Sequence, residues 1–289
     1  MSNFIISTES TCDLSLDYTL SRNIHVIDME YIVDGEVYGG GSGKNLPHTL
    51  FYNKMREGAK TSTSMVNEET AREHFEKLLK SGQDVLHIAF AKACSGTYDN
   101  LVRVAQELNA KNQNKIYVLD SKCESTGEGL LVDLCAKERD EGKSISETYS
   151  FLEDIRDNLN LLFTVDNLKY LAAGGRISKS TAIIGNIAKI KPMLYVDTTG
   201  KLTMGGKALG RKNSLIKLTN MAIEKFSGKY KKIFVSHADC IDDANFVIEK
   251  LKAKLPDTEI ILGEIGPVIG SHSGPGTLAI FFIGDVRAF

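Results

Sequence analysis

Ser95, Gly96 and Thr97 stand where a buried strand is expected to end and a helix to begin. The preceding residues 85–90 are apolar except for His87, and such a short run is typical of a strand buried on both faces of a parallel sheet. Apolar residues then recur at helical spacing over residues 101–108. The first N–H groups of a helix have no hydrogen-bond partner within the helix, and here two hydroxyl side chains lie beside them. This arrangement predicts a binding site for a carboxylate or a phosphate. The alternative is that Ser95 or Thr97 only caps the helix.

Two other hydroxyl-rich stretches lie at similar positions. Residues 61–64 are four consecutive hydroxyl residues ahead of a predicted helix, and they form either its N-terminal cap or part of a binding site. Residues 7–13 follow a first short strand at residues 4–6 and again indicate either local capping or a site. Ligands of open α/β sheets bind beyond the carboxyl ends of the strands. We therefore expect residues 7–13 and 95–97 at one sheet edge.

His272 and Arg176 are the candidate basic groups. His272 lies in a Gly- and Pro-rich run, residues 270–276, which predicts a rigid loop that holds the imidazole close to backbone or ligand. The alternative is that His272 only hydrogen-bonds within its own loop. Arg176 follows two glycines, and its forked guanidinium suits a carboxylate or a phosphate.

Composition limits the possible functions. The chain has 289 residues, 42% hydrophobic and 25% charged, with a net charge of −2, so no basic surface for nucleic acid is expected. No apolar run reaches the roughly 18 residues that a membrane span needs, and no secretory signal is visible, so we expect a cytoplasmic protein. The five scattered cysteines indicate reduced thiols, and the six histidines show no metal-binding spacing.

The order of the predicted elements indicates an α/β fold with two domains. The first half alternates strand and helix, as in a parallel α/β layer, and contains a hairpin with its turn at Asp34-Gly35. The second half is richer in strands. We expect one domain over residues 1–160, with a small hairpin insertion near residues 24–45, and a second, α+β domain over residues 161–289. Helices are expected over residues 181–190, 213–226 and 242–255, and strands over residues 161–165, 193–196, 201–204, 232–236, 259–262 and 277–284.

Six stretches of the chain together form a recognisable series of motifs. In order they are Glu9–Leu14, Lys60–Ser64, Ser95–Tyr98, Leu168–Ser178, Lys191–Leu202 and Gly270–Gly276. They resemble D-S-T-x-D-L, K-T-S-Q-P, S-G-T-Y, the run that ends in G-G-R-[IL]-S, K-P-[IL]-L…G-x-[IL] and G-x-H-[ST]-G-P-G of the DegV family, bacterial fatty-acid-binding proteins of which some are the lipid-binding subunit of a fatty acid kinase. Two positions depart from this pattern: Glu9 replaces the usual Asp, and Thr63-Ser64 replace the usual Gln-Pro, so the backbone there lacks the constraint of a proline.

The resemblance implies a DegV-like fold with a ligand tunnel between the two domains. It also implies that the chain binds a long-chain fatty acid such as palmitate, presents its carboxylate to a partner kinase that forms an acyl phosphate, and itself has no catalytic residue, metal or other cofactor. Apolar positions in residues 181–194 and 277–283 are candidates for the tunnel wall or for ordinary core. The implied carboxylate site comprises Thr61, Ser62, Thr63, Ser95 and the N–H of Gly96, with His272 and Arg176 near the head group.

Two other functions remain open from the sequence. A serine hydrolase or acyltransferase would use Ser95 with His272, although Ala93-Cys94-Ser95-Gly96 lacks the first glycine of G-x-S-x-G and no aspartate is evident to orient the histidine. Metal-assisted catalysis would use His237 and Asp239, for which the simpler interpretation is that Asp239 or Asp242 caps a helix.

Overall fold

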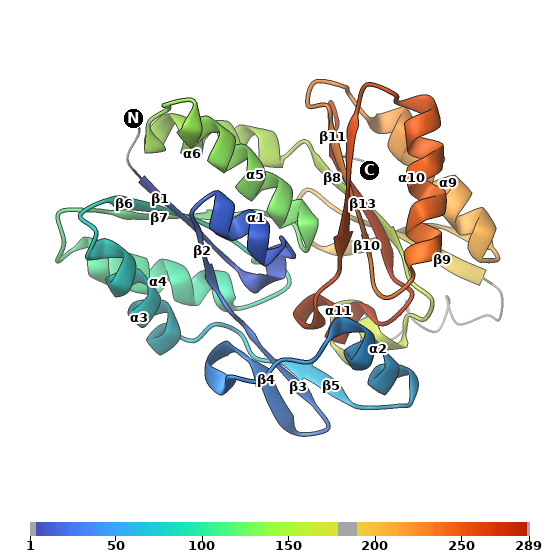
Figure 1. The fold of residues 1–289 in the computed structure, drawn as a ribbon, viewed down its shortest axis with the longest axis horizontal. Helices are drawn as coiled ribbons and strands as arrows, with labels where there is room; N and C mark the ends of the chain where they lie inside the picture. Colours follow the sequence, from blue (N-terminus) through green and yellow to red (C-terminus); the bar gives the residue numbers. More distant parts are fainter. Residues whose placement is uncertain (1–3, 179–189, 288–289) are drawn as a thin grey trace.

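The computed structural model describes residues 4–178 and 190–287, which form three sheets (Figure 1). The first sheet is parallel and has the order β2-β1-β6-β7. Its strands are β1 (Phe4–Glu9), β2 (Ile24–Ile27), β6 (Asp84–Ala89) and β7 (Ile116–Asp120). The first strand is longer than the predicted 4–6, because β1 includes residues 7–9. Because β1 and β6 are parallel neighbours, residues 10–13 and 95–97 lie beyond the same sheet edge, as expected from the sequence.

The second sheet is mixed and has the order β10-β9-β8-β13-β11-β12. All its pairs are antiparallel except β11 with β12. The expected first domain, which ends at residue 160, would include the first two residues of β8, and the division into two domains stays a prediction. The strands are β8 (Leu159–Thr164), β9 (Ile190–Val196), β10 (Leu202–Leu209), β11 (Lys232–His237), β12 (Glu259–Glu264) and β13 (Leu278–Ile283).

A small antiparallel sheet, β4-β3-β5, is attached to the first sheet's edge by β3 (Glu30–Val33). Its hairpin joins β3 to β4 (Glu36–Gly39) through Asp34 and Gly35, both at positive φ, so the predicted turn is confirmed. The third strand, β5, is Thr61–Thr63. Residues 61–64 therefore begin no helix. Asn67 caps α3 instead, its side chain accepting the N–H of Thr70 at 2.9 Å.

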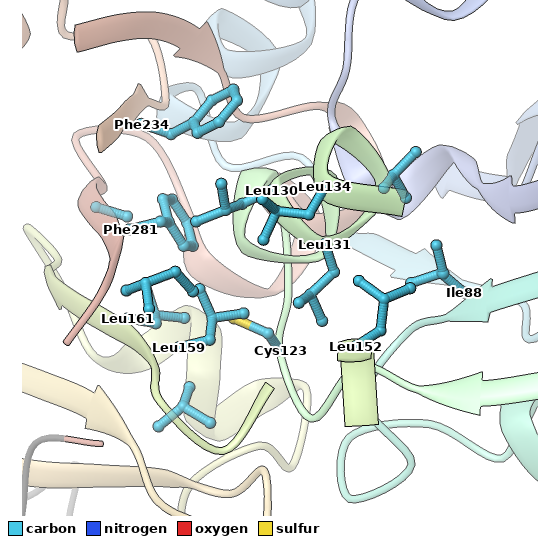
Figure 2. Close-up of a cluster of buried hydrophobic side chains, with 14 of the residues drawn as sticks. Ile88, Cys123, Leu130, Leu131, Leu134, Leu152, Leu159, Leu161, Phe234 and Phe281 are labelled. Carbon is cyan, nitrogen blue, oxygen red and sulfur yellow. The ribbon is translucent and has the colours of Figure 1, made fainter. Parts of the chain in front are cut away.

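The helix α5 joins the two large sheets into one core. Residues 126–136 of α5 are buried without exception, as expected of a helix covered on all sides. Figure 2 shows Leu130 of α5 and Phe281 of β13 in one cluster with Leu161 of β8. The helices are α1 (Leu16–Ser21), α2 (His48–Arg56), α3 (Glu68–Leu79), α4 (Thr97–Asn109), α5 (Thr126–Asp140), α6 (Ile145–Arg156), α7 (Lys169–Ala173), α9 (Arg211–Lys225), α10 (Ile241–Lys254) and α11 (Pro267–Ser273), with two short 3-10 helices, η1 (Ser10–Cys12) and η2 (Gly40–Ser42).

Two expectations for the second half are corrected. His272 does not lie in a loop, because residues 267–273 form the short helix α11, and only residues 274–276 of the expected loop are non-helical. Ile190, expected at the end of a helix, is instead the first residue of strand β9. The helix expected over residues 181–190 falls, up to residue 189, outside the described residues.

Candidate ligand-binding site

A cavity of about 1010 Å³ lies between the carboxyl edge of the parallel sheet and the mixed sheet. This volume is at the upper end of the roughly 300–1,000 Å³ range of small-molecule sites. Buried apolar side chains of β8 and β13, namely Leu161, Phe163, Ala279 and Phe281, line its deep end. Exposed residues of α3, such as Glu73 and Lys77, line its outer end. The cavity therefore runs from an apolar interior to a polar mouth.

Backbone and hydroxyl donors of the β6–α4 loop face this cavity. Both Ser95 and Gly96 line it, and Gly96 is the residue that precedes the first turn of α4. Within the described residues, the N–H groups of Ser95 and Gly96 donate to no other group. The hydroxyl of Ser95 donates to Thr97 Oγ1 at 3.0 Å and accepts the N–H of Thr97 at 3.2 Å. The N–H and hydroxyl groups of this loop can therefore bind an anion through hydrogen bonds.

Arg176 is fixed beside the loop by the way α7 ends. Gly175 has φ +74°, the N–H of Arg176 bonds Leu171 O at 2.9 Å, and the N–H of Gly175 bonds Ala172 O at 3.1 Å. This is a Schellman end, and its left-handed residue explains the glycine. The guanidinium donates to Gly174 O at 2.5 Å and to Cys94 O at 3.1 Å. It therefore brings a fixed positive charge to the cavity wall.

His272 lies close to the same wall on α11. Its Nε2 is 2.8 Å from Thr63 Oγ1, and both residues line the cavity. Gly174 permits this placement, because a Cβ there would be 2.2 Å from His272 Nδ1. Burial, with a smaller effect of Arg176, lowers the pKa of His272 from 6.5 to about 4. The imidazole is therefore neutral at pH 7 and serves as a hydrogen-bonding group.

Five of the seven residues predicted for the site line the cavity, and two do not. Ser62 is exposed and lies on the opposite face of β5 from Thr61 and Thr63, because successive side chains of a strand alternate. The hydroxyl of Thr61 is committed to Ser271 O at 3.0 Å. We therefore leave Ser62 and Thr61 out of the proposed carboxylate site. The five that line the cavity are Thr63, Ser95, Gly96, Arg176 and His272.

The sequence analysis missed several lining residues. Met65 covers the loop, its Sδ lying 2.9 Å from where a Cβ on Gly96 would be. Glu124 and Ser125 follow β7 and reach the cavity from the same sheet edge. The rule that strand ends meet at one edge would have found them. In the predicted tunnel stretches, Thr277, Ala279 and Phe281 line the cavity, whereas residues 181–189 lie outside the described chain.

The geometry gives no support to the two alternative catalytic sites. Among the described residues Ser95 bonds Thr97 and His272 bonds Thr63, so no hydrogen bond joins Ser95 to His272. A pKa near 4 also makes His272 a poor general base at neutral pH. His237 Nδ1 accepts the N–H of Cys240, the residue before α10, at 3.2 Å, and the predicted cap by Asp239 is wrong, because Cys240 holds the N-cap position and makes no side-chain cap bond.

The described residues carry few other features that bear on function. None of their helices has both the length and the apolar character needed to cross a membrane. All five cysteines are free thiols, as predicted. Asp239 is paired with Arg56 at 2.5 Å, and over the described ranges no three His, Cys, Asp or Glu side chains are grouped as metal ligands would be.

These features define a class of α/β protein in which hydrogen-bond donors at a sheet edge line a deep, largely apolar cavity. The DegV family model, described as "Uncharacterised protein, DegV family", matches residues 3–285. A DegV domain-containing protein of Clostridium perfringens is 40% identical, with 99% of each chain covered, and YteA of Lactococcus lactis is 33% identical, with 97% of each covered. The chain belongs to the DegV family.

Two solved structures share the fold closely. A DegV family protein from Thermus thermophilus, described by its fatty acid binding, has a TM-score of 0.85 and 27% identity, covering 98% of this chain and 99% of its own. DegV from Bacillus subtilis, described as a fatty acid binding protein, has a TM-score of 0.85 and 25% identity, covering 99% and 100%. The expected fold class, a parallel α/β sheet joined to a second sheet in a DegV-like arrangement, is confirmed.

Proposed function

We propose that this protein binds a long-chain fatty acid such as palmitate, with the acyl chain in the cavity and the carboxylate against the β6–α4 loop. The single observation that carries the proposal is the continuity of the cavity from the donors of Ser95 and Gly96 to the buried apolar wall of β8 and β13. The fatty acid binding described for the Thermus and Bacillus relatives supports it.

The proposed ligand meets the two ends of the cavity with matching chemistry. N–H groups, the Ser95 and Thr63 hydroxyls and the Arg176 guanidinium provide charge-assisted hydrogen bonds to the carboxylate. The acyl chain supplies most of the affinity: burying about 14 methylenes at ~0.8 kcal/mol each gains roughly 11 kcal/mol, before association costs of ~4–15 kcal/mol. A short acid has the same head group but lacks this gain.

We further propose that the bound carboxylate is presented to a partner kinase, which phosphorylates it to an acyl phosphate. The sequence has no Walker motif and no kinase signature, so the nucleotide chemistry belongs to the partner, and both proteins would meet in the cytoplasm. Arg176 and His272 suit this step. A fixed guanidinium compensates the charge added to the head group, and a neutral imidazole orients it.

A reconstituted assay with a DegV-type fatty acid kinase tests both levels of the proposal. Arg176→Ala and His272→Ala are loaded with palmitate, and retained lipid and acyl phosphate are measured in the same samples. We expect most lipid to be retained, because the other donors and the acyl chain remain, and most acyl phosphate to be lost. Arg72→Ala is the control, since Arg72 pairs with Glu107 on the surface outside the cavity. Wild-type turnover in both variants would remove the presenting role, whereas failure of the wild type to load palmitate would remove the binding role.

A further inference from the structure

Glu124 is a buried carboxyl in the wall of the cavity. Its residue exposure is 7%, and it lines the cavity together with Leu161, Phe163, Leu202 and Phe281. It lies in the β7–α5 loop next to Cys123, which Figure 2 shows beside Leu159 and Leu161. An unmodified acyl chain beside Glu124 would place its methylenes against a carboxyl group.

The hydrogen bonding of Glu124 is half complete. Cys94 Sγ donates to Glu124 Oε1 at 3.1 Å, and Glu124 Oε2 has no partner among the described residues. No described cation pairs with it either. The nearby Arg287 guanidinium donates instead to the carbonyls of Lys122, Asp197 and Arg156, at 2.9, 2.8 and 2.7 Å. Because a buried polar atom without a partner is costly, an unsatisfied oxygen at a ligand cavity indicates a group that the ligand supplies.

We propose that Glu124 recognises a hydroxyl group on the acyl chain, so that the preferred ligand is a hydroxylated long-chain fatty acid. This inference rests on the proposed function and names its ligand more closely. The neighbouring Ser125 is already committed, since its hydroxyl donates to Asp13 Oδ2 at 2.5 Å. Other polar residues, Thr11 and Ser273 among them, also line the cavity, and Ser273 Oγ, like Glu124 Oε2, has no partner among the described residues. Glu124 is the group among these that Cys94 holds next to the proposed carboxylate site.

The charge state of Glu124 favours a hydroxyl over other oxygen substituents. Burial raises the pKa of Glu124 to about 7, so its protonated and ionised forms are both populated near neutrality. The protonated form donates a hydrogen bond and the ionised form accepts one. A hydroxyl pairs with either form, whereas a ketone pairs only with the protonated form.

The position of the hydroxyl follows from the neighbours of Glu124. Cys94, which contacts the Glu124 carboxyl, directly precedes Ser95 of the proposed carboxylate site. Consecutive Cα atoms are about 3.8 Å apart, so Glu124 lies near the carboxylate end of the bound chain. We infer that the recognised hydroxyl stands on the half of the acyl chain nearer the carboxylate.

Displacement of a fluorescent fatty acid by stearate and by monohydroxystearates, with the hydroxyl at successive positions, tests the inference. In the wild type, at least one isomer with the hydroxyl in the proximal half should bind more tightly than stearate. Glu124→Leu should lower the affinity ratio of that isomer to stearate by about tenfold, because the hydroxyl loses its partner. Glu124→Gln keeps a hydrogen-bonding amide and should retain most of the ratio. Glu76→Leu, which removes an exposed carboxylate of α3 outside the cavity, should leave it unchanged.

The possible failures are distinguishable. Equal ratios in the wild type and Glu124→Leu for every isomer would overturn the hydroxyl inference while leaving fatty acid binding intact. A wild type that binds neither stearate nor any hydroxystearate would overturn the proposed function itself. If Glu124→Leu does not fold, native mass spectrometry of the wild type, offered an equimolar mixture of stearate and the best isomer, decides the matter: the inference requires enrichment of the hydroxy acid, and equal retention contradicts it.

Discussion

Replacing Ser95 with alanine tests the assignment of the carboxylate site. In the free protein the Ser95 hydroxyl donates to Thr97 Oγ1 at 3.0 Å, so it must give up this neutral bond to donate to a bound carboxylate. A charge-assisted bond contributes ~1.5–3 kcal/mol and a neutral one ~0.5–1.5 kcal/mol, which leaves a net gain of about 1–2 kcal/mol. Ser95→Ala should therefore weaken palmitate binding by about five- to thirtyfold.

The matched control is Ser62→Ala. Ser62 is also a hydroxyl residue predicted for the carboxylate site, but it is exposed on the far face of β5 and does not line the cavity. The assay is displacement of a fluorescent fatty acid by palmitate, with a thermal melt of each variant to confirm folding. An unchanged Kd in Ser95→Ala would refute the assignment, and so would an equal loss of affinity in Ser62→Ala.

The remaining predictions concern His272 and its support. Gly174→Ala places a Cβ 2.2 Å from His272 Nδ1 and should destabilise the fold by ~1–3 kcal/mol in denaturant unfolding; wild-type stability would contradict the tight contact. The folded pKa of His272, about 4, lies below the ordinary 6.5, so the unfolded state binds more protons and stability is lost as the pH falls from 6.5 toward 4. His272→Gln should therefore lose less unfolding free energy than the wild type between pH 7 and pH 5. The comparison with wild type is needed because Asp13 and Glu124, whose pKa values are raised to about 7, change the stability in the opposite direction. Equal losses in both proteins would contradict the prediction.

Much of the fold was predictable because its elements carry strong periodic patterns. The strand at residues 84–89 is mostly apolar, and α4 repeats its apolar residues at helical spacing. The edge shared by β1 and β6 followed from parallel topology alone. These are local signals, and tertiary contacts did not override them.

The choice between Ser62 and Thr63 could not be made from the sequence. The run Thr61–Thr63 is three hydroxyl residues long, with no apolar alternation to indicate which face is buried. The face is set by the pairing of Ser62 with Ile32 in β3, a contact between residues 30 positions apart in the chain. A shift of one residue in that pairing would have exchanged the two side chains.

The helix around His272 and the position of Glu124 in the cavity wall could not be predicted from the sequence either. Glycine is unfavourable within a helix, so the glycines of this run predicted a loop. Gly270 nevertheless lies in α11, because a Cβ at this position would be 2.3 Å from Tyr52 Oη and the packing therefore requires a glycine. Glu124 has no local motif. Its surroundings exist only once the β7–α5 loop meets β8 and β13 of the other sheet.

Native mass spectrometry of the protein as purified tests the central claim most directly. If the cavity holds an acyl chain, the intact protein should carry a mass increment equal to a long-chain fatty acid. Delipidated protein should regain that increment with palmitate and not with acetate, which lacks the chain that supplies the affinity. A protein that is purified without lipid and takes up neither acid, or takes up both equally, would contradict the account.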